Sequence, residues 1–254
     1  MSAGGAGKGM VDALSGMVDL GMFSREVSAE EEAQGAWKTA VAKDAVLATC
    51  NAKNPNLPMI RKQGLSKKAF ADLFLLEKVH YWKDYFKGAN DSRINVYTRS
   101  DACGAAQMWG LFLGASQEAL HGIGVFGDPG MADAVKNDRM GLGYNNVVYI
   151  YDIQSRKKYQ GLEVIPIDLN GDGRISPDED FYGSLDSVMT AIKNNVYPSP
   201  PARALYFVSK GQPKDELVKL FLEWILTAGQ NFVSEAGYVK LAEDKIQQEL
   251  KRLQ

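Results

Sequence analysis

Residues 168–179 place oxygen-bearing side chains at a spacing that suits a calcium ion. Calcium takes about six to eight oxygen ligands in proteins. Side chains of Asp168, Asn170, Asp172 and Glu179 and the backbone carbonyl of Arg174 would supply them, as in an EF-hand loop. Gly173 would allow the sharp turn that such a loop needs. The alternative is an acidic loop that is held only by its own Asx turns.

The segments on either side of this loop differ from those of a calcium sensor. Residues 162–167 alternate and are rich in β-branched side chains, which predicts a strand, and residues 177–192 predict a helix. A regulatory EF-hand has a helix on each side and a second loop as its partner. We therefore expect calcium as a structural cofactor.

The start of the chain could bind an anion. Residues 2–9 are rich in glycine and run into a helix predicted over 10–16, so backbone amides near Ala6, Gly7 and Lys8 could converge on a negative group. The loop does not end in the Lys-Ser/Thr pair of a nucleotide-binding P-loop. A flexible tail or a plain turn is the alternative.

Two arginines lie close after predicted strands. Arg99 comes after the strand predicted over 93–98 and before a helix from about 101 to 113, and Arg25 comes after the strand 18–22. A guanidinium group can donate two parallel hydrogen bonds to an oxyanion, and a helix start adds more donors. Each arginine taken alone could equally be a surface or structural charge.

The composition excludes several classes of protein. The chain has 254 residues, 45% of them apolar, and a formal net charge of −2. It can therefore bury a large core, and its charge argues against a nucleic acid partner. Its apolar runs are shorter than the ~20 residues that span a bilayer, and no signal segment is seen at the start. Cys50 and Cys103 could form a disulfide or stay as thiols.

Strand-like and helix-like segments alternate, which predicts an α/β fold. Further strands are predicted over 45–51, 142–151 and 204–209. Helices are predicted over 66–74, 214–227 and 243–253. In the second of these, Leu217, Phe221, Trp224 and Ile225 fall on one face.

Several motifs together resemble those of phosphate-binding proteins from ABC uptake systems. In chain order they are G-G-A-G-K-G, V-D-L-G-M-F-S-R-E-V, F-A-D-L-F, I-N-V-Y-T-R-S-D-A-C-G-A-A, Y-P-S-P-P-A-R-A-L-Y-F-V and F-L-E-W-I-L-T-A-G-Q-N-F-V-S-E-A-G-Y-V. The ordered set covers nearly the whole chain. The resemblance implies a type II periplasmic-binding fold, in which two α/β lobes hinged by crossing strands close on a small oxyanion.

The resemblance also implies where the lobes and the ligand site lie. The first lobe would combine residues 1–48 and 203–254, and the second would hold residues 49–202 with the calcium loop. The implied ligand-binding residues are Ala6, Gly7, Lys8, Ser24, Arg25, Arg99, Asp101, Cys103, Gly104 and Ala105. Asp101 could accept a proton from hydrogenphosphate and so disfavour sulfate, or it could only pair with Arg99 and orient it.

The chain departs from the family pattern at three places. Cys103 and Ala105 stand where the family has serine and threonine, and Ala6 stands where it has another serine, so hydroxyl donors are lost. Family members also have a strand, a helix and a strand before the glycine loop. The first lobe is accordingly expected to be incomplete at its N-terminus. The two cysteines would fall near the cleft rim, and a disulfide between them is a hypothesis.

These observations predict a solute-binding protein that is not an enzyme. It would be a periplasmic or extracytoplasmic monomer, capture phosphate or a related oxyanion, and deliver it to the membrane subunits of an ABC transporter. The alternative is a calcium-stabilised adhesion or signalling module that keeps the fold without transport. No serine or cysteine is paired with a histidine at a recognisable catalytic spacing.

Overall fold

The computed structural model describes residues 5–254, and its chain divides into two compact units. Unit 1 comprises Met1–Asp44, Ala102–Gly104 and Ala202–Gln254, and unit 2 comprises Ala45–Asp101 and Ala105–Pro201. The short segment Ala102–Gly104 thus belongs to unit 1, whereas the sequence placed it in the second lobe.

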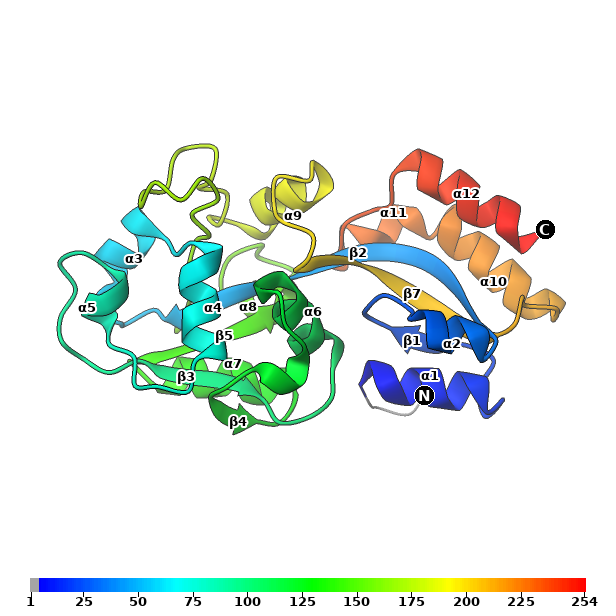
Figure 1. Ribbon diagram of the computed structural model, residues 1–254. Helices are drawn as coiled ribbons and strands as arrows, with labels where there is room; N and C mark the ends of the chain where they lie inside the picture. The colour runs from blue at the N-terminus through cyan, green and yellow to red at the C-terminus, as the bar shows by residue number, and fades with distance from the viewer. Residues whose placement is uncertain (1–4) are drawn as a thin grey trace. The chain divides into compact units, whose positions relative to one another are not determined.

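Unit 1 is built on strands β1, β7 and the first part of β2 (Figure 1). Its elements are α1 (Ala6–Leu14), β1 (Gly21–Phe23), α2 (Ala29–Ala33), β2 (Ala36–Asn51), β7 (Ala202–Lys210), α10 (Glu216–Leu226), α11 (Gln230–Val233) and α12 (Glu243–Leu253). β1 pairs antiparallel with β7, with Gly21 opposite Val208. α1 packs on β1 and β7, and α10 lies beside α12 (Figure 1). The core joins Met10, Phe23, Val208, Leu222 and Leu226.

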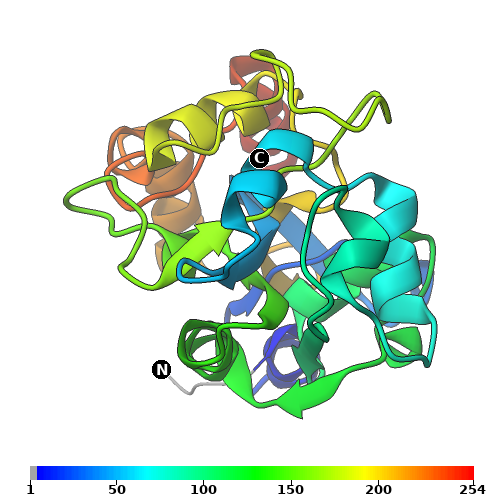
Figure 2. The same cartoon turned by 90° about the vertical axis from the view of Figure 1, so that its left-hand side faces the viewer.

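Unit 2 continues β2 as the centre of a mixed sheet. β5 (Gly141–Asn146) and β6 (Leu162–Val164) pair antiparallel with β2, and β3 (Asn95–Arg99) lies parallel to β5 and to β4 (Ile123–Val125). The helices are α3 (Leu57–Gln63), α4 (Lys67–Leu75), α5 (Trp82–Tyr85), α6 (Gly104–Leu113), a 3-10 turn (Gln117–Ala119), α7 (Gly127–Asn137), α8 (Val147–Ile150) and α9 (Leu185–Lys193). The cyan helices α3, α4 and α5 lie on the side of unit 2 that Figure 2 turns to the viewer.

Two predicted elements of unit 2 are wrong in part. The predicted strand 142–151 ends at Asn146, and residues Val147–Ile150 form α8. A short apolar run has no period that separates a strand from a buried helical turn, and here Val147 and Ile150 are both buried. The helix predicted from residue 177 begins only at Leu185, because Ser184 caps it by accepting a hydrogen bond from Ser187.

Helix α10 buries a different side from the one that its pattern suggested. Leu222 and Leu226 are buried, whereas Leu217, Phe221 and Trp224 are 76%, 47% and 50% exposed. The helix is apolar on most of its circumference, so its sequence did not decide which side faces the core. Within residues 5–254 no helix is both long enough and apolar enough to span a bilayer.

The hypothesis of a disulfide is wrong, since Cys50 and Cys103 are both free thiols. Cys50 is fully buried, and this burial raises the pKa of its thiol. Cys103 is partly exposed. We expect the native protein to react with one equivalent of a thiol reagent at pH 8, and with two after denaturation. Two fast equivalents in the native protein would contradict the burial of Cys50.

Candidate oxyanion site

Arg99 ends strand β3 and is the most extensively bonded charge among the predicted site residues. Its Nε and Nη2 atoms donate to the two carboxylate oxygens of Asp101, at 2.7 and 2.6 Å, and Nη1 donates to Asp128. Its backbone N–H donates to the hydroxyl of Tyr144 at 3.1 Å. The side chain of Arg99 is only 5% exposed, so the guanidinium is held in one orientation.

Asp101 is ionised in this arrangement. The hydrogen bonds from Arg99 lower the pKa of Asp101 against the effect of burial, and the N–H of Gly127 adds a bond at 3.1 Å. Both of its oxygens are therefore engaged, which is the geometry expected of a carboxylate that orients Arg99. Asp128, at the start of α7, was not predicted from the sequence, because nothing in its local motif indicates that α7 begins beside Arg99.

The segment Ala102–Gly104 lies against two predicted binding elements of unit 1. A Cβ atom placed on Gly5 would come within 2.5 Å of the carbonyl oxygen of Ala102, and one on Gly104 within 2.5 Å of the carbonyl oxygen of Ser24. Gly5, directly before α1, thus lies against Ala102, and Ser24 lies against Gly104. Residues 2–4 of the glycine-rich loop lie outside the described residues.

The first residues of α1 and α6 offer backbone donors rather than side-chain donors. Ala6, Gly7 and Gly104, Ala105 occupy first turns, where N–H groups have no intrahelical acceptor. The methyl groups of Ala6 and Ala105 are buried, so these two residues can contribute only their amides. The helix dipoles favour a negative ligand at these ends.

The structure gives Arg25 and Lys8 partners within unit 1. Arg25 donates through Nη1 and Nη2 to Glu31, at 2.8 and 2.6 Å, and its guanidinium lies 4.3 Å from the centre of the Phe23 ring. Although burial raises it, the bonds from Arg25 and from the backbone of Ser28 leave the pKa of Glu31 below its usual value. Lys8 Nζ lies 2.6 Å from Asp12, one helical turn away. An oxyanion bound at either cation would compete with that carboxylate or share the cation with it.

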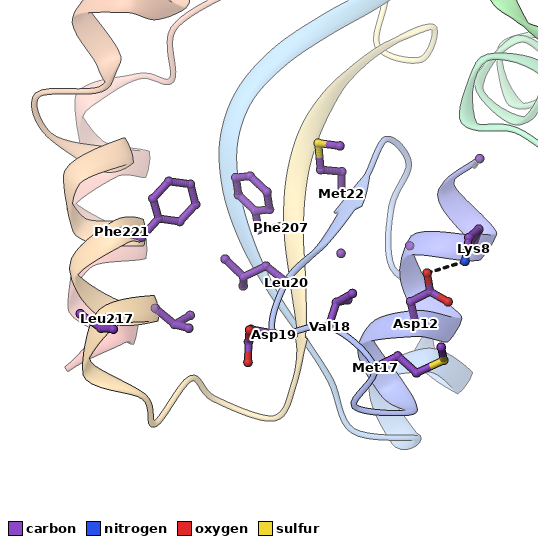
Figure 3. Close-up of a pocket in the computed structure, with 14 residues that line it drawn as sticks. Lys8, Asp12, Met17, Val18, Asp19, Leu20, Met22, Phe207, Leu217 and Phe221 are labelled. Carbon is purple, nitrogen blue, oxygen red and sulfur yellow. Dashed lines mark hydrogen bonds and ion pairs between the residues drawn. The ribbon is translucent and has the colours of Figure 1, made fainter. Parts of the chain in front are cut away.

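The pocket in Figure 3 has a different character. It has a volume of about 650 Å³ and is lined mainly by apolar side chains, with Phe221 of α10 facing Phe207 (Figure 3). Leu20, Met22 and Leu217 also line it. Its charged lining consists of Lys8, paired with Asp12, and Asp19. Since carboxylates outnumber the lysine, this pocket does not suit an oxyanion.

The calcium loop is held by its own amides in this structure. Asp168 accepts hydrogen bonds from Gly171, Asp172 and Gly173, and Glu179 accepts from Leu169, Asn170 and Ser176. Asp172 accepts from Asn170 and Arg174. Although burial raises it, the bonds from Ser176 leave the pKa of Glu179 below its usual value. Over residues 5–254, no three His, Cys, Asp or Glu side chains are grouped so that they could hold a metal ion.

Gly104 and Gly7 give a matched test of the backbone site. Gly104→Ala should destabilise the protein by roughly 1–3 kcal/mol and weaken oxyanion binding, because the new methyl group meets the backbone of Ser24. Gly7→Ala places its methyl group where, apart from its chain neighbours and the backbone of α1, nothing lies within 4 Å, and should stabilise α1 by about 1 kcal/mol. Denaturant unfolding of both variants measures this, and equal effects would contradict the packing of Gly104.

The chain belongs to the PBP superfamily, since the model of the PBP superfamily domain matches residues 1–228. A search of curated protein sequences found no significant match to the chain.

Three solved structures show the same fold. A protein of Clostridium perfringens, described as a phosphate ABC transporter substrate-binding protein and solved with bound phosphate, is 21% identical, with a TM-score of 0.72 over 94% of this chain and 85% of its own. An ABC-type phosphate transport receptor from Vibrio cholerae is 17% identical, with a TM-score of 0.66 over 93% and 86%. The high-affinity periplasmic phosphate-binding protein PfluDING, solved with phosphate, is 12% identical, with a TM-score of 0.71 over 96% and 84%.

Proposed function

We propose that this protein is a solute-binding protein that captures a tetrahedral oxyanion, phosphate, as an extracytoplasmic monomer and delivers it to the membrane subunits of an ABC transporter. The observation that carries the proposal is Arg99, which two carboxylates hold in a fixed orientation at the end of β3. Only residues 100–103 separate it from the start of α6. Membership of the PBP superfamily and the phosphate bound by the similar structures support it.

The proposed ligand set combines charge with backbone geometry. Arg99 and Arg25 would supply the positive charge, and the amides of Ala6, Gly7, Gly104 and Ala105 would supply directed hydrogen bonds. Ser24, Lys8 and Cys103 are the other members of the set. Charge-assisted hydrogen bonds are about twice as strong as neutral ones, so arginines and amides can bind an oxyanion without the hydroxyl groups that this chain lacks. We propose a role in binding, because the set consists of cations and backbone donors that suit an anion.

Isothermal titration of the anion-stripped protein with phosphate, and with sulfate for comparison, tests this proposal. We expect micromolar or tighter binding of phosphate, and weaker binding of sulfate, because the ionised Asp101 can accept a hydrogen bond from hydrogenphosphate and repels a fully ionised ligand. Failure of both anions to bind would reject the proposal. It would favour the alternative of a module that keeps the fold without transport.

Calcium binding at residues 168–179 is a separate proposal. The donor oxygens have the chemistry that calcium prefers, and Gly171 and Gly173 adopt the positive φ values, +75° and +77°, that a tight loop of this kind needs. Binding would require Glu179 to turn from the amides of Leu169 and Asn170 towards the ion.

We expect calcium at about a hundred times its Kd to stabilise the wild-type protein by about 2.7 kcal/mol, as measured by denaturant unfolding. Asp168→Ala should remove this calcium-dependent stabilisation, and so should Glu179→Ala. Asp178→Ala, which alters an exposed carboxylate beside the predicted ligands, should leave it unchanged. Equal unfolding curves of the wild type with calcium and with a chelator would reject the site.

A further inference from the structure

Arg203 is a buried cation that the proposed ligand set does not use. It lies on β7, is 4% exposed, and contacts Gly104 and Asp44 of unit 1. Its Nη1 donates to the carbonyl oxygen of Gly104 at 3.1 Å, and its Nη2 lies 3.3 Å from Oδ2 of Asp44. Asp44 is also buried, at 5% exposure. The guanidinium therefore links strand β2 to the first residue of α6.

The bond to the carbonyl of Gly104 also fixes the N–H group of Ala105, which belongs to the same peptide unit. A trans peptide unit is planar, and its C=O and N–H groups point in opposite directions. The carbonyl of Gly104 shares its peptide plane with the N–H of Ala105, so the atom that Arg203 binds determines where this N–H points. Ala105 is one of the proposed amide donors.

Close packing restrains the residues that precede this peptide as well. The close approach of Gly104 to the Ser24 backbone, and of Gly5 to Ala102, leaves little room for the segment to shift. A rotation of the Gly104–Ala105 peptide would break the bond to Arg203 and leave a buried guanidinium with one partner fewer, which is costly. The arrangement resembles a preformed donor that need not reorganise when a ligand arrives.

We propose that Arg203 is a positioning residue: through the carbonyl of Gly104 it holds the N–H of Ala105 in the direction that receives the oxyanion. This inference rests on the proposed function. Asp44 neutralises Arg203, so the contribution of Arg203 is orientation and not net attraction. Hydrogen bonding of the carbonyl also polarises the peptide and makes its N–H a stronger donor.

The test combines titration with inorganic phosphate and the amide resonance of Ala105 in a ¹⁵N-labelled protein. Arg203→Met removes the donor and should weaken phosphate binding roughly 10- to 100-fold, the range for one hydrogen bond to a charged group. It should also move the Ala105 resonance in the free protein and reduce its response to phosphate. Arg203→Lys replaces the guanidinium, which has several N–H donors in one plane, with a single ammonium group. Its phosphate affinity should fall between those of the wild type and Arg203→Met.

Lys210→Met is the control, because Lys210 is exposed on the same strand and should change neither the Kd nor the resonance. A folded Arg203→Met that binds phosphate within about twofold of the wild type would overturn the inference. If Arg203→Met does not fold, Arg203→Lys takes its place, and a wild-type phosphate affinity in Arg203→Lys would overturn the inference. The inference would also be overturned if phosphate did not shift the Ala105 resonance of the wild-type protein. These results differ from failure of the proposed function, in which the wild type itself binds no phosphate.

Discussion

Arg99→Ala is expected to weaken phosphate binding by more than about 100-fold in isothermal titration. The substitution removes a guanidinium whose orientation is set by Asp101 and Asp128, and it leaves those two carboxylates without the cation that they share. Loss of one charge-assisted partner costs about 1.5–3 kcal/mol, and uncompensated negative charge opposes an anion further. Arg99→Lys should bind with intermediate affinity, because lysine keeps the charge and loses the two-point contact with Asp101.

Arg156→Ala is the matched control for Arg99. Arg156 lies in the same unit and also donates through two nitrogen atoms to one carboxylate, that of Asp186, at 3.0 and 2.6 Å. Asp186 is 65% exposed, and such a pair contributes up to about 1 kcal/mol to stability. We expect an unchanged phosphate affinity for this variant. An unchanged affinity in folded Arg99→Ala would remove Arg99 from the ligand set.

Trp109→Ala is expected to destabilise the protein by about 3–5 kcal/mol, the largest stability loss that we predict. Trp109 is fully buried on α6. Its ring stacks on Tyr144, with centroids 5.6 Å apart, and meets the edges of Phe70 and Phe74 at 5.3 and 5.6 Å. Removing the indole would leave a cavity among rings that cannot all move inward. Denaturant unfolding measures the loss.

Two further variants of α6 define the origin of this loss. The indole N–H of Trp109 is buried with no hydrogen-bond partner in the described residues 5–254, so Trp109→Phe discards an unsatisfied donor and should cost much less than Trp109→Ala. Leu111→Ala alters a side chain of the same helix that is 47% exposed, and should change stability by about 0.5 kcal/mol or less. Similar losses in Trp109→Ala and Leu111→Ala would contradict the packing of this core.

The elements that the sequence predicted well are those with a local signal. The helix from Ser66 was expected because a serine cap precedes a helical apolar pattern, and Ser66 does cap α4 by accepting from Ala69. Strand β3 and the helix after it were expected because a strand-like segment ends at Arg99 and small residues follow it. The α/β class follows from such alternations alone.

The features that the sequence did not predict depend on distant partners. Asp128 bonds to Arg99, and Arg203 bonds to Gly104, although the partners are far apart in the chain. No local sequence motif predicts either contact. The buried side of α10 was missed because most of its positions are apolar, so only packing against α12 and the core of unit 1 could decide it. The side-chain partners of Arg25 and Lys8 were missed as well, although Glu31 and Asp12 lie close in sequence. Sequence alone does not distinguish a cation that binds a ligand from one that belongs to an ion pair.

The unequal environments of the two cysteines have a practical consequence. Cys50 is sealed in the core, whereas Cys103 is partly exposed and lies in the segment that carries the proposed amide donors. A thiol-reactive fluorophore would therefore attach at a single position without any engineered cysteine. Because Cys103 is a member of the proposed ligand set, the label would occupy the proposed anion site, and phosphate added beforehand should slow the labelling.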